Sequence, residues 1–270
     1  MTRHLLHIGY AKTATNFLRA WFDAHPQIAF VPGGFGGFRR IADIAAPAHL
    51  AAEPPRLRAT SSELLATPHA EVAKTVGYGR SGETFPRDQA LVCDTLHELF
   101  PGADVLIVTR GFRTMIHSAY SQYVRTGGTD GLAAFARDAQ ERGAWHYDRL
   151  IASYAAAFGP ERLIVMPWEL LRDRPAEFVG RLEERLGLDP GPVPAERPNP
   201  ALSPTQIAAQ LRRNRAPRLV RRLPRIGRAP PAESLDEAQV AAYRGQAASL
   251  AENPLHRPYA AEYLFRDGPA

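Results

Sequence analysis

The sequence predicts an α/β fold in which a central parallel sheet lies between two layers of helices, giving a three-layer α/β/α domain. Short apolar runs typical of buried strands occur at residues 5–8, 105–108 and 162–166. Apolar residues at helical spacing follow these runs, so strands and helices alternate up to residue 187. Such alternation favours parallel strands joined by helices that cover both faces of the sheet.

The first strand, loop and helix are predicted within the first 25 residues. The apolar run at residues 5–8 indicates a short buried strand, and residues 9–15 form a loop of small residues. The helix that follows is marked by apolar side chains at helical spacing: Phe17, Leu18, Trp21 and Phe22. It is expected to end near His25, because Pro26 comes next.

The later elements repeat this pattern. Residues 105–108 form a β-branched and apolar run, as expected for a central strand buried on both faces. A further short strand is predicted at residues 74–77. Helical stripes are predicted at residues 91–100, 115–123, 147–158 and 178–186.

The rest of the chain predicts loops and a helical tail within one domain, 1–270. Residues 31–70 contain glycine clusters and prolines and are expected to form an acceptor loop. Residues 189–200 form a proline-rich connector, and residues 201–270 a helical, arginine-rich C-terminal part. The core of the domain is therefore expected at about residues 4–187.

Composition restricts the class of protein. The net charge of +5 and the isoelectric point near 9.6 favour an anionic ligand or partner. No apolar run approaches the roughly 18 residues of a membrane span, and the first residues lack a secretory apolar core. Cys93 is the single cysteine, which excludes an internal disulfide and a cysteine-based zinc site. We therefore expect a cytoplasmic protein.

A candidate anion site lies between the first strand and the first helix. Residues 9–16 (GYAKTATN) are small enough for backbone N–H groups to turn inward, and the helix N-terminus adds about half a positive charge. Lys12 and Lys74 are the only lysines beside 31 arginines, so a lysine in this loop is informative. Hydroxyls at Thr13 and Thr15 add hydrogen bonds. The alternative is an ordinary turn of small residues.

The loop differs from the phosphate loop of nucleotide triphosphatases. Ala11 precedes Lys12 where that motif has glycine, and the spacing from Gly9 is wrong. Such enzymes also need an acid after a later strand to hold magnesium. Here the best later strand ends at Thr109 and Arg110, which places a cation at that position. A nucleoside or nucleotide kinase on a related fold stays as an alternative.

The loop resembles the 5′-phosphosulfate loop of sulfotransferases, roughly Pro-Lys-Ser/Thr-Gly-Thr-Thr. The match includes Lys12, Thr13 and Thr15, whereas alanine replaces proline at 11 and glycine at 14, and Asn16 replaces the second threonine. The resemblance implies a P-loop-like sulfotransferase fold. It also implies binding of 3′-phosphoadenosine 5′-phosphosulfate (PAPS) by the following residues: Lys12, Thr13, Ala14, Thr15 and Asn16. Phe17 stands where some members stack a tryptophan on adenine, with core packing as the alternative.

A second segment resembles the family's 3′-phosphate signature, roughly Arg-Asp/Asn-Pro-x-x-Arg-x-x-Ser-x-Tyr. Arg110 ends a predicted strand, and Ser118 follows eight residues later inside a predicted helix. Arginine presents a charged fork to phosphate, and serine donates a hydrogen bond. Gly111-Phe112 departs from the usual Asp/Asn-Pro. The Ser-x-Tyr-Ser-x-Tyr ending is closer to bacterial and carbohydrate-type members than to cytosolic steroid or phenol types.

A third segment, residues 79–85, loosely resembles a Lys-Ser/Thr-x-x-Tyr-Phe pattern of carbohydrate sulfotransferases. Arg80 would then stand near the transferring group, and Glu83 is the candidate general base. A polar turn before a helix is the alternative. The arginine stretch at residues 211–228 is compatible with binding of the nucleotide, of an anionic acceptor or of a membrane surface, and equally with a solvated helix.

The resemblance implies transfer of a sulfuryl group from PAPS to a hydroxyl or amine of an acceptor, with release of 3′-phosphoadenosine 5′-phosphate (PAP). The acceptor is expected to be a small molecule, a carbohydrate or a lipid. No metal and no nucleic-acid partner are expected. A non-catalytic binder of nucleic acid or another anionic ligand is the second alternative, but it leaves both phosphate motifs unexplained.

Overall fold

A central sheet organises the part of the chain that the computed structural model describes, residues 3–31, 56–63, 65–66, 85–195, 202–216 and 235–265. The sheet has five parallel strands in the order β2-β3-β1-β4-β5. The strands are β1 (Arg3–His7), β2 (Ile28–Val31), β3 (Leu57–Ser61), β4 (Asp104–Thr109) and β5 (Leu163–Pro167). The predicted three-layer α/β fold is thus confirmed.

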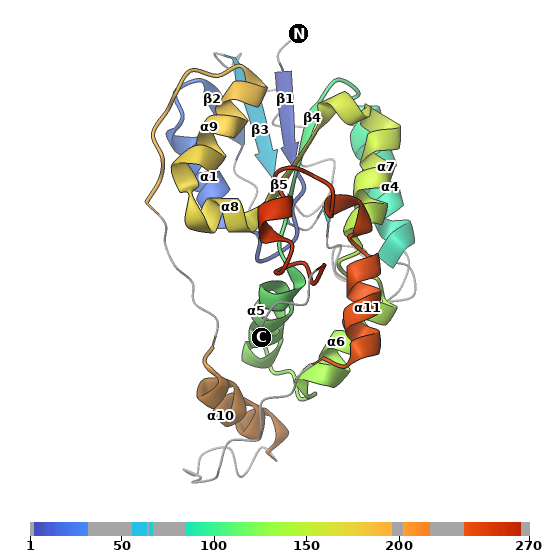
Figure 1. Ribbon diagram of the computed structural model, residues 1–270. Helices are drawn as coiled ribbons and strands as arrows, with labels where there is room; N and C mark the ends of the chain where they lie inside the picture. The colour runs from blue at the N-terminus through green and yellow to red at the C-terminus, as the bar shows by residue number, and fades with distance from the viewer. Residues whose placement is uncertain are drawn as a thin grey trace.

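Helices cover both faces of this sheet (Figure 1). On one side lie α1 (Thr15–Ala24), α8 (Trp168–Asp173) and α9 (Pro175–Leu186); on the other lie α4 (Phe85–Leu99) and α7 (Tyr147–Phe158). Beyond the carboxyl ends of the strands lie α5 (Phe112–Arg125), α6 (Leu132–Glu141) and α11 (Glu237–Gly245), and α10 (Pro204–Arg215) packs on α5. Short 3₁₀ turns are η1 (Pro160–Arg162), η3 (Ala248–Leu250) and η4 (Arg257–Tyr259).

Most sequence-predicted elements are found where they were expected. The apolar runs at residues 5–8, 105–108 and 162–166 correspond to β1, β4 and β5, and the predicted helices correspond to α1, α4, α5, α7 and α9. Every residue of β4 is buried, as a central parallel strand requires. The strand predicted at residues 74–77 lies outside the described residues.

The assignment of residues 31–70 to a loop was wrong in part. Residues 57–61 form β3, which pairs with β1 from Arg3↔Leu57 to His7↔Ser61 and with β2 on its other side. Its sequence, Leu-Arg-Ala-Thr-Ser, lacks the apolar run by which the other strands were recognised. The strand forms because hydrogen bonds to two neighbours compensate for its low intrinsic strand propensity.

The carboxyl ends of the central strands meet at one edge of the sheet. His7 of β1 lies opposite Ser61 of β3, and their side chains form a hydrogen bond of 2.8 Å. On the other side of β1, His7 lies opposite Leu106, and β4 ends three residues further on at Thr109. In open α/β sheets, ligands bind at this edge. Both motifs recognised in the sequence begin there, one after β1 and one after β4.

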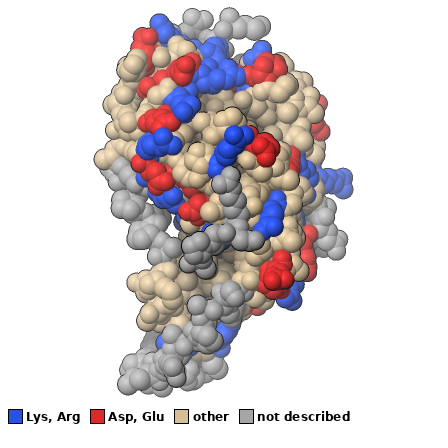
Figure 2. Space-filling model, in the orientation of Figure 1, with Lys and Arg blue, Asp and Glu red and all other residues tan. Residues whose placement is uncertain are grey.

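Two properties of the molecular surface are relevant to function. Among the described residues, no helix combines the length and apolarity needed to cross a membrane. Basic and acidic side chains are interspersed over much of the face shown in Figure 2, so the net positive charge is not gathered into one patch on that face.

Candidate functional site

The loop after β1 is shaped to receive an anion. Lys12 and Ala14 both adopt left-handed backbone conformations, with φ of 73° and 68°. Left-handed residues on either side of Thr13, which does not have a positive φ, turn successive backbone N–H groups toward one point. Ala14 is the N-cap of α1 and supplies no side-chain cap, and the buried Thr15 Oγ1 has no partner among the described residues. These free donors fit a phosphate group.

Internal contacts hold the loop in this shape. The hydroxyl of Thr13 donates a hydrogen bond to the carbonyl of Tyr10, so this hydroxyl is engaged within the loop. A Cβ atom at Gly9 would lie 2.6 Å from His7 Nε2 and 3.1 Å from Thr13 Oγ1. The tight approach of β1 and the loop therefore requires glycine at position 9.

The ammonium group of Lys12 lies among other charges. Burial lowers the pKa of this half-buried lysine, and the cations Arg125 and Arg110 lower it further, whereas Glu63 raises it. Glu63 stands two residues beyond β3, and the N–H of the preceding Ser62 donates to His7 O at 3.0 Å. Neither Glu63 nor Arg125 was recognised from the sequence. Glu63 could have been found from its position after β3, at the ligand edge of the sheet, but β3 itself was not predicted.

Arg110 joins the second motif to the first. It follows β4 directly, and its Nη1 donates to the carbonyl of Lys12 at 3.0 Å while its Nε donates to Thr114 Oγ1 at 3.0 Å. The guanidinium lies 3.8 Å from the ring centroid of Trp168, a residue that sequence analysis missed. These two hydrogen bonds use Nε and Nη1. Among the described residues none accepts from Nη2, which is therefore available to bind a ligand.

The remaining predicted binding residues lie near this edge in different environments. Ser118 lies on α5 and is 6% exposed, so its side chain is not on a solvated face of that helix. Phe17 is 9% exposed and packs in the hydrophobic core, and Asn16 is exposed. Arg80 and Glu83 lie outside the described residues, as do residues 217–228 of the arginine stretch.

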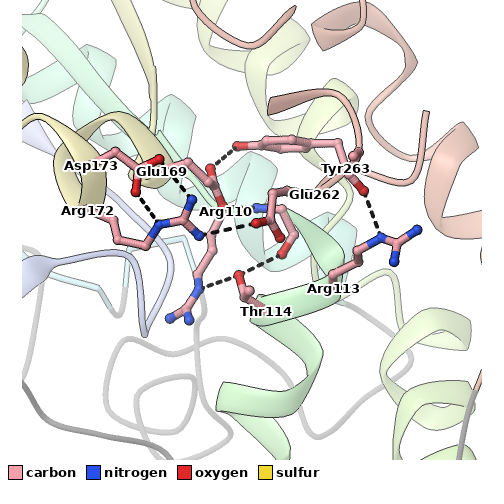
Figure 3. A network of polar contacts seen from close by, with 10 residues as sticks. Arg110, Arg113, Thr114, Glu169, Arg172, Asp173, Glu262 and Tyr263 are labelled. Carbon is pink, nitrogen blue, oxygen red and sulfur yellow. Dashed lines mark hydrogen bonds and ion pairs between the residues drawn. The ribbon is translucent and has the colours of Figure 1, made fainter. Parts of the chain in front are cut away.

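A buried polar network supports Arg110 from behind (Figure 3). The carboxylate of Glu169 accepts a hydrogen bond of 2.8 Å from Gly111 N and one of 3.3 Å from the Tyr263 hydroxyl. Burial raises the pKa of Glu169 to about 7, against the lowering effects of the Gly111 hydrogen bond and of Arg110. Burial lowers the pKa of Arg110, which Glu169 in turn raises.

Sequence analysis missed Trp168, Glu169 and Tyr263. A signal was available for the first two, because they follow the predicted strand at residues 162–166 and therefore stand at the ligand edge of the sheet. Tyr263 carries no such local signal, since its partners are about a hundred residues away in the chain. In the described part of the chain, no group of three or more His, Cys, Asp or Glu side chains is arranged to hold a metal ion.

Comparison with known proteins shows the fold. The chain is similar to a sulfotransferase from Alicyclobacillus acidocaldarius, with a TM-score of 0.52 and 18% identity over 79% of this chain and 93% of that one. A mouse sulfotransferase, SULT7A1, complexed with PAP, matches with a TM-score of 0.44 and 13% identity over 79% and 64% of the two chains. No family model and no curated protein sequence matches. The chain therefore has a sulfotransferase-like fold.

Proposed function

We propose that this protein is a PAPS-dependent sulfotransferase. The observation that carries the proposal is the hydrogen bond of 3.0 Å from Arg110 to the carbonyl of Lys12. It joins two cationic motifs, recognised separately in the sequence, at the ligand edge of a sulfotransferase-like sheet. A nucleotide with phosphates at both its 3′ and 5′ positions fits two such adjacent sites.

Each residue of the site has a distinct role in this proposal. The loop N–H groups and Thr15 hold the 5′-phosphate, and Lys12 lies beside the bond that breaks. Arg110 and Ser118 hold the 3′-phosphate, with the guanidinium fixed by Trp168 and Thr114. PAPS supplies the activated sulfuryl group. Lys12 then stabilises the negative charge that grows on the leaving phosphate, as preorganised cations do at other anionic transition states.

A general base must accept the proton of the acceptor hydroxyl or amine. Glu83 is the candidate from sequence, with Arg80 beside the transferring group. Within the described residues, Glu63 is a second candidate because its charge acts directly on Lys12. The proposed acceptor is a small molecule, a carbohydrate or a lipid headgroup, and the proposed compartment is the cytoplasm.

Nucleotide selectivity tests the proposal. PAP should bind more tightly than adenosine 5′-phosphate by about 2–3 kcal/mol, which corresponds to about 30- to 150-fold, because the latter lacks the charged contact with Arg110. Isothermal titration calorimetry measures both affinities, with ATP and magnesium as the comparison for a kinase. Arg110→Ala should remove most of the preference, leaving only the contribution of Ser118. Arg110→Lys should restore part of it, since lysine lacks the planar fork. Equal affinity of the wild type for both nucleotides would refute the assignment.

A further inference from the structure

Glu169 is a fully buried carboxylate beside the proposed 3′-phosphate site. It is 0% exposed and is the second residue after β5, in the first turn of α8. Burying a carboxylate is costly unless hydrogen bonds compensate for the lost hydration. Glu169 has two such partners, Gly111 N at 2.8 Å and the Tyr263 hydroxyl at 3.3 Å.

These two partners hold the chain on both sides of Arg110. Gly111 is the residue after it, and Glu169 binds the Gly111 N–H directly. Thr109 is the residue before it, and its hydroxyl lies 2.7 Å from the Tyr263 hydroxyl. The carbonyl of Arg110 itself accepts a hydrogen bond of 2.7 Å from Tyr147. The backbone that aims the Arg110 guanidinium is therefore fixed at three successive residues.

The C-terminal segment, residues 256–265, completes this support. His256 Nε2 lies 2.9 Å from Thr109 Oγ1, and the carbonyl of Glu262 accepts a hydrogen bond of 3.1 Å from Arg113 N. The carboxylate of Glu262 also pairs with Arg172 at 3.2 Å (Figure 3). Residues about 150 positions from Arg110 along the chain thus pack directly against the turn that carries it.

The hydrogen bonds form a chain that ends on Glu169. The hydroxyl of Tyr263 donates to the Glu169 carboxylate, so it must accept from Thr109, and Thr109 in turn accepts from His256 Nε2. Burial lowers the pKa of His256 to about 3, which keeps it neutral with a single N–H to donate. When Glu169 is ionised it can only accept, and this sets the direction of the hydrogen bonds along Tyr263, Thr109 and His256.

We propose that Glu169 is a positioning residue, which fixes the turn at residues 109–111 so that Arg110 selects nucleotides bearing a 3′-phosphate. This inference rests on the proposed function, because it assumes that Arg110 binds that phosphate. Glu169 does not contact the nucleotide. It acts through the backbone of Gly111 and through Tyr263, and its loss releases the guanidinium from its place beside the Lys12 loop.

The test compares the selectivity for PAP over adenosine 5′-phosphate in variants of the full chain. Glu169→Leu removes both hydrogen bonds and should reduce the selectivity about tenfold, the loss expected when a charged contact is misplaced. Glu169→Asp keeps the charge but is one methylene too short for Gly111 N, and should also reduce selectivity. Glu169→Gln keeps an acceptor oxygen for Gly111 and should retain selectivity within about threefold.

A matched control separates positioning from general destabilisation. Glu183, on α9, is also a buried glutamate that accepts a hydrogen bond of 2.8 Å from a glycine N–H, that of Gly191. Glu183→Leu should lower stability but leave nucleotide selectivity unchanged. In an Arg110→Ala background, Glu169→Asp should have no further effect on selectivity, because its influence passes through Arg110.

The possible outcomes are distinguishable. A wild-type protein without preference for PAP overturns the proposed function itself. A selective wild type whose folded Glu169→Asp variant keeps that selectivity overturns the role of Glu169 alone. If Glu183→Leu loses as much selectivity as Glu169→Leu, the role of Glu169 is also overturned, because general destabilisation then explains the effect. If Glu169→Leu does not fold, Glu169→Asp and Glu169→Gln still decide the question.

Discussion

Replacing Glu169 by glutamine should change how stability depends on pH. Burial raises the pKa of this carboxyl from 4.5 to about 7. Between these values the unfolded chain has lost the proton that the folded chain retains, so the free energy of unfolding falls as pH rises. At about 1.4 kcal/mol per pH unit, the difference corresponds to about 3 kcal/mol, present below about pH 4.5 and lost as pH rises through about 7.

Glutamine at position 169 cannot ionise, yet it offers an oxygen to Gly111 and an amide N–H to Tyr263. The stability of Glu169→Gln should therefore lack this fall. Urea unfolding followed by circular dichroism, at intervals from about pH 5 to about pH 8, gives the free energy of unfolding of both proteins. The variant should gain at least about 2 kcal/mol relative to the wild type across this range.

Buried histidines also make the stability depend on pH in this range, so the difference between the two proteins is the informative quantity. Burial lowers the pKa of three histidines: His4 to about 4, His7 to about 3 and His256 to about 3. A depressed folded-state pKa makes histidine stabilise the fold increasingly as pH rises toward its ordinary value near 6.5. Both proteins share this trend. A difference in stability that stayed constant from acid to neutral pH would refute the reasoning.

Three further predictions concern the loop and the proposed base. Lys12→Ala should lower the rate of transfer from labelled PAPS by about 10²–10³-fold and weaken PAP binding less, since Lys12 favours the transition state; an unchanged rate would remove it from catalysis. Ala14→Gly should raise the free energy of unfolding by about 1 kcal/mol in urea titrations, because glycine adopts a φ of 68° without strain, and a loss of stability would contradict this. Of Glu83→Gln and Glu63→Gln, the variant that removes the base should slow transfer by about 10²-fold at unchanged PAP affinity. If both keep the wild-type rate, the base lies elsewhere in residues 31–70.

The layers of the fold could be predicted because local patterns encode them. A buried parallel strand such as β4 needs an uninterrupted apolar run, and helices that cover a sheet need apolar side chains at helical spacing. β3 could not be predicted in the same way. Its five residues, Leu-Arg-Ala-Thr-Ser, contain no apolar run and too short an alternation to mark a strand, and its pairing partners lie elsewhere in the chain.

In the candidate site, too, local motifs could be identified from the sequence, whereas contacts between distant segments could not. Lys12 and Arg110 could be identified because each stands at the end of a recognisable strand within a motif of fixed spacing. The contact between them could not, because it joins residues 98 positions apart. Glu169 and Tyr263 were missed for a related reason. A buried acid and a buried tyrosine have a role only once the fold brings them together behind Arg110.

The sequence departs from the family's Asp/Asn-Pro pattern at the point where the C-terminal segment packs. A Cβ atom at Gly111 would lie 2.4 Å from Glu262 Cβ and 2.7 Å from the Glu262 backbone, so any side chain larger than hydrogen would displace that segment. Phe112, the second departure, is fully buried and stacks on Tyr147 at 5.2 Å between ring centroids. Proline at 112 would lose this stacking, and aspartate at 111 would clash. Gly111 and Phe112 therefore suit the packing of the C-terminal segment, which contacts the Arg110 turn through Glu262 and Tyr263.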